Sequence, residues 1–331
     1  MERRTFLSFA ALFGGGMLVS ACGGDGNNTA VTTTTTADTA LAATQAKPTG
    51  AVTMYYEIRV PNPEKATVLA KIDALIGLMK AKTGYLSLSF KQMTGESTMV
   101  KNYPNSMKGA LDQGFVGNSK VPNFYSLFVR FDNYDNMLAS GVQQWFVDNI
   151  QPSLFAYNGA TTPPTKTSVV LEHYEGVYVT VAAGDRTAIY TTPEAIETFL
   201  KNQSDEVNNL YVTVENHVMI NNVYLAEFNT KVRTLLTTAQ TTFQPSDDPA
   251  GLGLAGAADN TYYRKAVTTE ILQNAFYDGN LRSYIMHGVW ESMYDHENSH
   301  IDTRFQQASG PVGAYVVVGP VEPFYNTIKQ G

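Results

Sequence analysis

The chain has 331 residues, a formal net charge of -7 at pH 7, 44% hydrophobic residues and 16% charged residues. This composition supplies enough apolar side chains for one large or two ordinary domains. The acidic balance, without runs of lysine and arginine, argues against a nucleic-acid partner. Only the N-terminus carries a long apolar stretch, which argues against a multi-pass membrane protein. The single cysteine excludes an intrachain disulfide and cysteine-rich zinc modules.

Residues 1–22 have the pattern of a lipoprotein signal peptide. A basic pair precedes a short apolar run, which ends at small residues and Cys22. The stretch Val19-Ser20-Ala21-Cys22 resembles a bacterial lipobox, in which a diacylglycerol is attached to the cysteine and cleavage occurs just before it. We therefore predict lipidation of Cys22 and anchoring in a membrane, at about 0.8 kcal/mol per buried CH2 group. An ordinary signal peptide with a chance cysteine is the alternative.

The stretch from Arg3 to Leu7 also resembles the twin-arginine export motif, although Glu2 and Ser8 depart from its usual pattern. This resemblance implies export of the folded protein. Residues 23–50 are rich in threonine, alanine and glycine and cannot form a core, so we predict a disordered tether. The expected location is the cell envelope, on a membrane and facing the periplasm or the exterior.

Residues 51–184 are predicted to form a first folded half. Apolar and polar side chains alternate over residues 52–60, as in a strand with one buried face. Asn62, Pro63 and Glu64 suit the start of a helix. The later patterns predict that helix up to Gly84, strands at 85–90 and 124–131 around an insertion at 94–121, a helix up to Ile150 and a strand at 176–181.

Residues 208–328 repeat this order after a linker at residues 185–207. Strands are predicted at 211–220, 266–272, 284–290 and 313–318, with one helix after the first strand and another after the third. Glu57 aligns with Glu215, Tyr125 with Tyr284, Phe131 with Trp290 and Gly176 with Gly313. We interpret this as an internal duplication. The order strand, helix, strand, strand, helix, strand predicts a ferredoxin-like α+β unit in each half.

A four-stranded sheet with helices on one face leaves its other face uncovered. Two such sheets in one chain can cover each other, so we predict a pseudo-symmetric dimeric α+β barrel made by a single chain. The protein is then expected to be a monomer that forms its own internal dimer. Any pocket for a small-molecule ligand is expected between the two sheets.

Trp290-Glu291-Ser292, followed by His300 and Phe305, resembles the stretch from third strand to second helix of antibiotic-biosynthesis-monooxygenase-like domains. His300 lies one residue off the spacing in that family, and Phe131 takes the tryptophan position in the first half. The resemblance covers most of residues 51–325 as two copies. It implies the dimeric α+β barrel fold, a fold that does not by itself decide the reaction.

The superfamily that this resemblance implies includes cofactor-independent oxygenases of aromatic substrates, haem-degrading enzymes and members without known chemistry. We therefore expect a monooxygenase that acts on a small aromatic or apolar molecule without a bound cofactor. A non-catalytic lipoprotein that binds a small molecule or haem is the alternative. The Asn, Trp and His of the haem-degrading members cannot be placed at their spacing here, and both haem and zinc remain open as ligands.

Strand parity predicts which side chains point into the space between the sheets. A histidine beside a carboxylate in a half-apolar cavity can act as a general base near neutral pH. We predict Glu215, His217 and His287 as catalytic residues. The predicted substrate-binding residues are Tyr55, Glu57, Arg59, Phe128 and Trp290. The alternative is a satisfied polar layer where the two sheets meet.

His296-Glu297-Asn298-Ser299-His300 has the form HExxH. On a helix the two histidines lie one turn apart and could bind zinc, with Glu297 activating water and Glu322 as a third ligand. Asp295 and Asp302 flank the motif, whereas such motifs in zinc proteases usually lie in apolar, buried helices. A zinc-dependent hydrolase is therefore a second alternative function, and an incidental metal site is another explanation of the motif.

Overall fold

The computed structural model describes residues 45–94, 123–202, 211–241, 265–300 and 302–331. The predicted signal peptide, most of the predicted tether and nearly all of the predicted insertion at 94–121 lie outside these residues. All described residues belong to one compact unit, residues 37–331. In the described part of the chain, no helix has the length and apolar character needed to cross a membrane.

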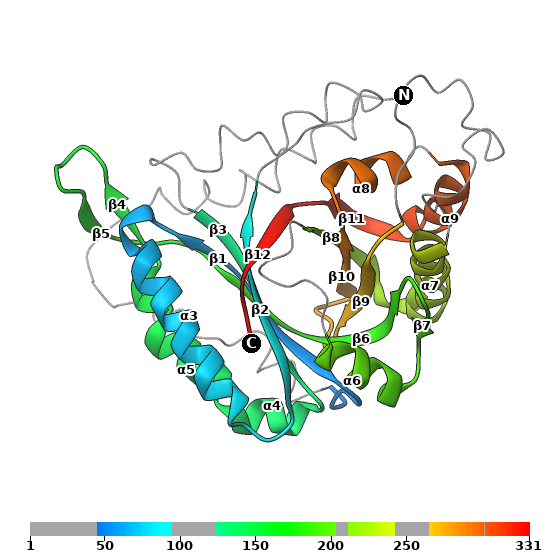
Figure 1. The fold of residues 1–331 in the computed structure, drawn as a ribbon, viewed down its shortest axis with the longest axis horizontal. Coiled ribbons are helices and arrows are strands. Elements are labelled where there is room, and N and C mark those ends of the chain that lie inside the picture. Colours follow the sequence, from blue (N-terminus) through cyan, green and yellow to red (C-terminus); the bar gives the residue numbers. More distant parts are fainter. Residues whose placement is uncertain (1–44, 95–122, 203–210, 242–264, 301) are drawn as a thin grey trace. The chain divides into compact units, whose positions relative to one another are not determined.

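Eight of the described strands pair into a closed antiparallel ring (Figure 1). The order around the ring is β1, β3, β2, β12, β8, β10, β9 and β6, and β6 pairs again with β1. The bounds are β1 Val52–Val60, β2 Tyr85–Met93, β3 Asn123–Phe131, β6 Tyr174–Asp185, β8 Val212–Asn221, β9 Thr268–Asn274, β10 Leu281–Trp290 and β12 Phe324–Gln330. A closed ring has no free edge strand, so every backbone edge in it is paired.

Each half of the ring has the strand order of a ferredoxin-like unit. The first half runs β6, β1, β3, β2 and the second half runs β12, β8, β10, β9, so each fourth strand lies beside the first strand of its own half. The two halves join where β2 pairs with β12 and β6 pairs with β9. The predicted dimeric α+β barrel, fused in one chain, is confirmed.

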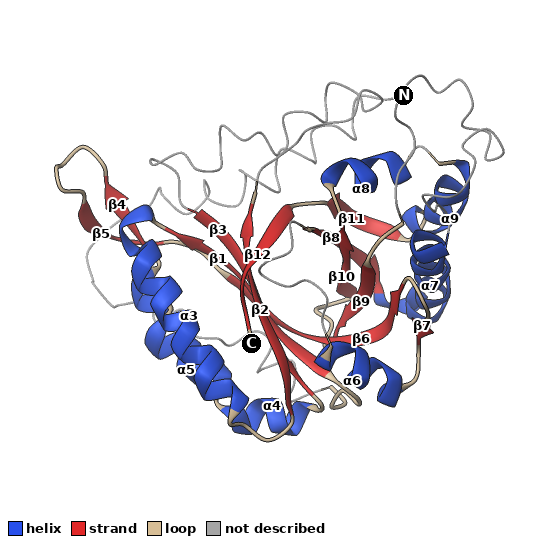
Figure 2. Ribbon diagram, viewed as in Figure 1, coloured by secondary structure: helices blue, strands red, loops and turns tan. Residues whose placement is uncertain are grey.

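Helices cover the outer face of each half-sheet (Figure 2). The first half carries α3 (Lys65–Lys80), α4 (Tyr134–Ser140) and α5 (Val142–Asn149), and the second carries α7 (Leu225–Thr241), α8 (Met293–Ser299) and α9 (Thr303–Gly313). Helix α3 buries Val68, Ile72, Leu75 and Met79, which recur at helical spacing and so form one apolar face. These side chains join the outward-facing residues of β1, β2 and β3 in one core.

The predicted linker contains β7 (Ile189–Tyr190) and α6 (Pro193–Lys201). The Thr192 side chain accepts a hydrogen bond from the Ala195 backbone N–H and caps α6. Ile196, Phe199 and Leu200 pack against residues at the starts of β1 and β2 and near the end of β6. Helix α6 therefore covers the end of the barrel where β1 and β2 begin. A hairpin of β4 (Phe155–Asn158) and β5 (Thr165–Val170) precedes β6.

The predicted last strand of the second half, residues 313–318, is wrong in position. Gly313 still belongs to α9, and the strand that follows it, β11 (Val316–Val321), pairs only with β8 and in an irregular register. The ring is closed by β12, which pairs with both β8 and β2. Alternating apolar residues indicate that a strand forms, but they do not say which strand has partners on both edges.

The predicted alignment of the two first strands is displaced by two residues. Tyr55 pairs with Phe128 in the first half, and Glu215 pairs with His287 in the second. Since Phe128 and His287 are equivalent, the counterpart of Glu215 is Tyr55 and not Glu57. A shift of two residues keeps every side chain on the same face of a strand, so the alternation pattern cannot reveal it.

Candidate functional site

The barrel interior holds a layer of buried polar side chains. The Tyr55 hydroxyl lies 2.8 Å from Glu215 and 2.9 Å from Glu57, and the Ser126 hydroxyl donates to Glu215 at 2.6 Å. Tyr55 and Glu215 are fully buried. Burial raises the pKa of Glu215 to about 8, and its hydrogen bond from Ser126 only partly opposes this. Glu215 is therefore held largely as the neutral acid at pH 7.

The predicted catalytic residues separate into two places in this layer. The His217 Nε2 atom lies 3.2 Å from Glu57 and 3.9 Å from Glu215. Burial lowers the pKa of His217. His287 packs against Phe128, with ring centroids 5.2 Å apart, and its Nδ1 atom lies 3.9 Å from Glu270.

Arg59 lies on the inward face of β1, as expected, opposite Phe124 on β3, whereas Trp290 lies elsewhere than expected. The Arg59 guanidinium lies over the Phe124 ring. Trp290 points to the helical side of its sheet, where it packs with Val212, Val214 and Met293. The structure thus brings Tyr55, Glu57, Glu215 and His217 together, and the catalytic roles assigned to Glu215, His217 and His287 stay predictions.

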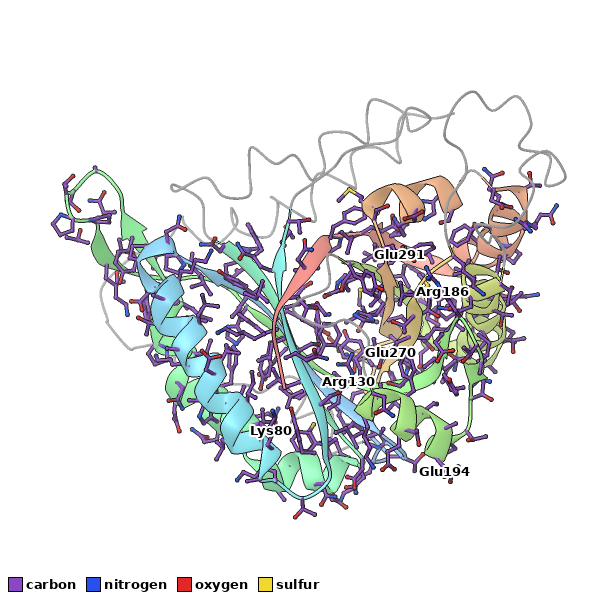
Figure 3. The ribbon with its side chains drawn as sticks, in the orientation of Figure 1. Lys80, Arg130, Arg186, Glu194, Glu270 and Glu291 are labelled. Atoms are coloured by element: carbon purple, nitrogen blue, oxygen red, sulfur yellow. The ribbon has the colours of Figure 1, made fainter. Side chains whose placement is uncertain are left out.

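An ion pair that sequence analysis missed crosses the same interior. Arg130 on β3 donates to Glu270 on β9 at 2.8 Å, and both side chains are fully buried (Figure 3). The Thr180 hydroxyl on β6 donates to the second Glu270 oxygen at 2.6 Å. The pair links the two halves of the barrel. Strand parity could have placed Arg130 inside, because Leu127, Val129 and Phe131 form the opposite, helix-facing set.

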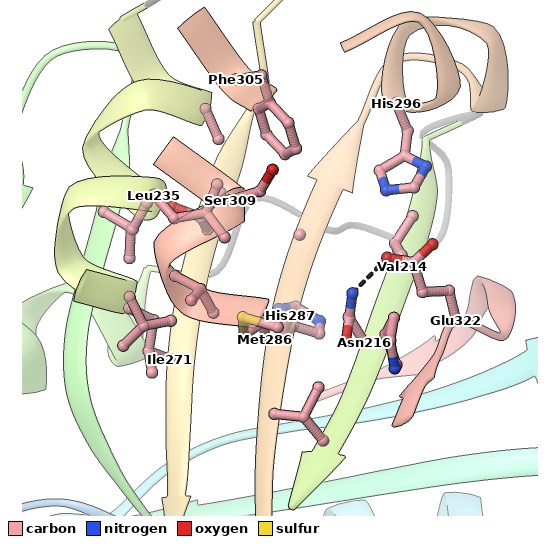
Figure 4. Close-up of a pocket in the computed structure, with 18 of the residues that line it drawn as sticks. Val214, Asn216, Leu235, Ile271, Met286, His287, His296, Phe305, Ser309 and Glu322 are labelled. Atoms are coloured by element: carbon pink, nitrogen blue, oxygen red, sulfur yellow. Dashed lines mark hydrogen bonds between the residues drawn. The ribbon is translucent and has the colours of Figure 1, made fainter. Parts of the chain in front are cut away.

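The cavity of the second half lies on the other face of the sheet from the one predicted. A space of about 370 Å³ separates the outer face of β8, β9 and β10 from helices α7, α8 and α9 (Figure 4). The expectation of a pocket between the two sheets is therefore not met by this cavity. Its apolar walls include Val214, Leu235, Ile271, Met286 and Phe305. Cavities of roughly 300–1,000 Å³ with mostly apolar walls are typical of small-molecule sites.

Two substitutions between the halves change the space under the helices. By the strand register, Asn216 occupies the place of Tyr56, and Gly288 occupies the place of Val129. In the first half the Tyr56 ring stacks on Phe146 at 4.0 Å and fills the space under the helices. In the second half the Trp290 indole covers Gly288, with Nε1 2.8 Å from the position that a Cβ would take, whereas the shorter Asn216 side chain leaves the space of the Tyr56 ring to the cavity.

Polar groups gather at one end of the cavity. His296 and His300 have ring centroids 4.6 Å apart, and Glu322 accepts a hydrogen bond from the Asn216 side chain (Figure 4). His296 is 5% exposed, and its Nδ1 atom has no hydrogen-bond partner in the part of the chain that the structure describes. Burial, with a smaller contribution from His300, lowers the pKa of His296 well below its usual value. This imidazole is therefore neutral at pH 7. The side chain of Glu297, the predicted water-activating group, lies outside the described part of the structure.

Comparison with protein families matches each half separately. Residues 51–136 match the ABM-like domain. Residues 181–328 match the CT0912-like C-terminal domain. The ABM-like match agrees with the resemblance drawn from the sequence, although that resemblance depended mainly on residues of the second half. No curated protein matches the chain.

The solved structures that are similar to this chain share little sequence with it. Two proteins named as proposed monooxygenases, from Fusobacterium nucleatum and Lactobacillus acidophilus, are 8% and 7% identical with TM-scores of 0.48 and 0.49. Each covers 85% of this chain, which in turn covers 94% and 96% of theirs. An anthrone oxidase-like protein is 12% identical, with a TM-score of 0.45. The match covers 85% of this chain and 92% of the chain of that protein.

Proposed function

We propose that the chain is a monooxygenase that oxidises a small aromatic or apolar molecule in the cavity of the second half. The observation that carries this proposal is the cavity itself, about 370 Å³ with mostly apolar walls and polar groups at one end. An aromatic ring fits the apolar walls, and its hydroxyl groups fit the polar end near Asn216. The ABM-like match of residues 51–136 supports the same class of reaction.

The proposed reaction needs no external reductant when the substrate is a hydroquinone. One oxygen atom of O2 enters the ring, which is oxidised to a hydroxyquinone, and the other oxygen atom leaves as water. The substrate supplies all four electrons. The two hydroxyl protons and the one displaced ring hydrogen balance this reaction, because two of these three hydrogens end in water and one ends on the new hydroxyl group.

Oxygen uptake with a panel of hydroquinones and polycyclic phenols tests this proposal. Ser309 borders the cavity on α9, so Ser309→Phe should fill the cavity and lower kcat/KM at least tenfold, a loss of about 1.4 kcal/mol in transition-state binding. Gln307→Phe is the matched control, since Gln307 is exposed on the same helix and does not line the cavity. Its kcat/KM should remain that of the parent chain.

Two outcomes would overturn the proposal. One is binding of these ligands without oxygen uptake, which would favour the non-catalytic binding protein. The other is an equal loss of activity in Ser309→Phe and Gln307→Phe, which would place the reaction outside the cavity. The mass of the product, increased by one oxygen atom relative to a quinone, distinguishes oxygenation from simple oxidation of the hydroquinone.

We further propose that the protein acts at the cell envelope, held by acyl chains on Cys22. The pattern of residues 1–22 supports this, since the only cysteine of the chain falls at the lipobox position. Cells fed a radiolabelled fatty acid should label the parent chain and not Cys22→Ser, which should appear in the soluble fraction after export. Equal membrane association of both chains would contradict the anchor.

A further inference from the structure

Three potential metal ligands converge on the cavity from two separate parts of the chain. His296 lies on α8 and His300 follows this helix, whereas Glu322 lies between β11 and β12. One ligand atom from each residue lies within 4.8 Å of the other two. The HExxH spacing explains the meeting of the two histidines, because residues four apart lie on one face of a helix. The tertiary structure adds the carboxylate.

The environment of His296 leaves one imidazole nitrogen available to a ligand. The ring is buried between Trp290 and Phe324, at centroid distances of 5.3 and 5.4 Å, and its Nδ1 atom has no hydrogen-bond partner among the described residues. A buried polar atom without a partner costs about 1–3 kcal/mol, so native structures rarely keep one without a function or a bound species. Neutral imidazole nitrogens are metal ligands, and the adjacent carboxylate provides negative charge.

We propose that His296, His300 and Glu322 bind one divalent transition-metal ion at the wall of the cavity. Two histidines and one carboxylate are a common ligand set for catalytic zinc and for non-haem iron(II), and both leave coordination positions open. Bonds of about 2.0–2.2 Å hold such ligand atoms roughly 3.4 Å apart. The ligand atoms now lie up to 4.8 Å apart, so metal binding would draw them closer together. All three residues line the cavity, so the open positions face a bound small molecule.

The surroundings of the three residues resemble the outer shell of a metal site. The Asn216 amide donates to Glu322 and so orients its carboxylate. The His300 ring stacks on Phe305 at 5.2 Å, with 25° between the ring planes. Groups that hold the ligands in this way usually contribute to metal affinity.

The acidic residues that flank the motif have a local explanation. Asp295 accepts a hydrogen bond from the Ser292 hydroxyl at 2.6 Å, and Asp302 caps α9 and pairs with Arg304. Both aspartates are 3% exposed. The polar sequence around HExxH therefore does not mark a solvent-exposed helix, and the sequence argument against a metal site does not hold for this structure.

A second cluster, Glu57, Glu215 and His217, also places its ligand atoms within 4.8 Å of one another. Two of its groups already have partners in the protein, because Glu215 accepts from Ser126 and both Glu215 and Glu57 lie within hydrogen-bond distance of the Tyr55 hydroxyl. Burial also holds Glu215 protonated to about pH 8, which disfavours a cation. The cluster in the barrel interior therefore serves as the comparison site in the test.

Metal titration of the chelator-treated chain tests the proposal, with Zn²⁺ and Co²⁺ as probes. Calorimetry and metal analysis should give one ion per chain, and bound Co²⁺ should show visible d–d absorption. His296→Ala and Glu322→Gln should lose this stoichiometric ion. Asn216→Ala should weaken binding by about 10- to 100-fold. His217→Gln, in the comparison cluster, and His173→Ala, in the first half, should bind as the parent does.

Several results would overturn the proposal. The first is a parent chain that binds less than one metal ion per chain. The second is a His217→Gln variant that loses the metal ion as fully as His296→Ala does. Circular dichroism of each variant shows whether a loss reflects unfolding, and Glu322→Gln keeps the size of the side chain. The metal is measured without substrate, so metal binding without oxygen uptake would support this site while overturning only the proposed reaction.

Discussion

Replacement of Arg130 by methionine is expected to destabilise the barrel by about 3–5 kcal/mol. The variant leaves Glu270 fully buried without its cationic partner, and the remaining hydrogen bond from Thr180 does not compensate a buried charge. Urea unfolding followed by circular dichroism measures the change in free energy. Because the ion pair connects β3 with β9, its loss should weaken the association of the two halves of the barrel.

Two further variants make this result specific to the buried pair. Arg130→Met combined with Glu270→Met should recover most of the stability, since apolar residues of similar size often replace a buried ion pair without loss. Lys201→Met breaks a surface ion pair in which the side chains of Lys201 and Glu197 are 52% and 38% exposed. This variant should lose about 0.5 kcal/mol of stability or less. Equal effects of Arg130→Met and Lys201→Met would contradict the prediction.

As the pH rises, the Glu215→Gln variant should gain stability relative to the parent chain. The pKa of Glu215 is about 8 in the folded protein and 4.5 as its ordinary value, so folding takes up a proton between these pH values. The native state then binds more protons than the unfolded state, and the parent chain loses stability from about pH 5 to about pH 8. The glutamine variant lacks this loss, which amounts to roughly 3–5 kcal/mol.

Thermal unfolding of both proteins at pH 5 and pH 8 measures this difference. The neighbouring groups His217 and Glu57 are present in both proteins, so their titration largely cancels in the comparison. Glutamine retains the shape of the side chain and can still accept a hydrogen bond from Ser126. Unfolding temperatures that change in parallel between the two pH values would show that Glu215 is not held neutral by burial.

Much of the fold followed from local patterns in the sequence. The alternation over β1 and the helical spacing of Val68, Ile72, Leu75 and Met79 depend only on which face of an element is buried. The same reasoning predicted that two incomplete sheets would cover each other. Errors arose where the answer depended on distant partners, as for β12 and for the two-residue shift between β1 and β8.

The candidate site, too, was predicted only in the features that depend on local sequence patterns. Strand parity correctly gathered Tyr55, Glu57, Glu215 and His217 on inward faces, and the HExxH spacing correctly paired His296 with His300. It could not show that the interior of the barrel would be occupied by hydrogen-bonded side chains. Nor could strand parity show that Asn216 would border a cavity on the helical side, because that depends on the residue that it replaces in the other half.

Periodicity, together with the need to remove apolar surface from water, was sufficient to predict most of the elements, their buried faces and the pairing of the halves. The strand that closes the ring, the place where the chain leaves space and the position of Glu322 beside His296 and His300 are visible only in the folded chain. These features depend on contacts between residues far apart in the chain, and no local pattern records such contacts.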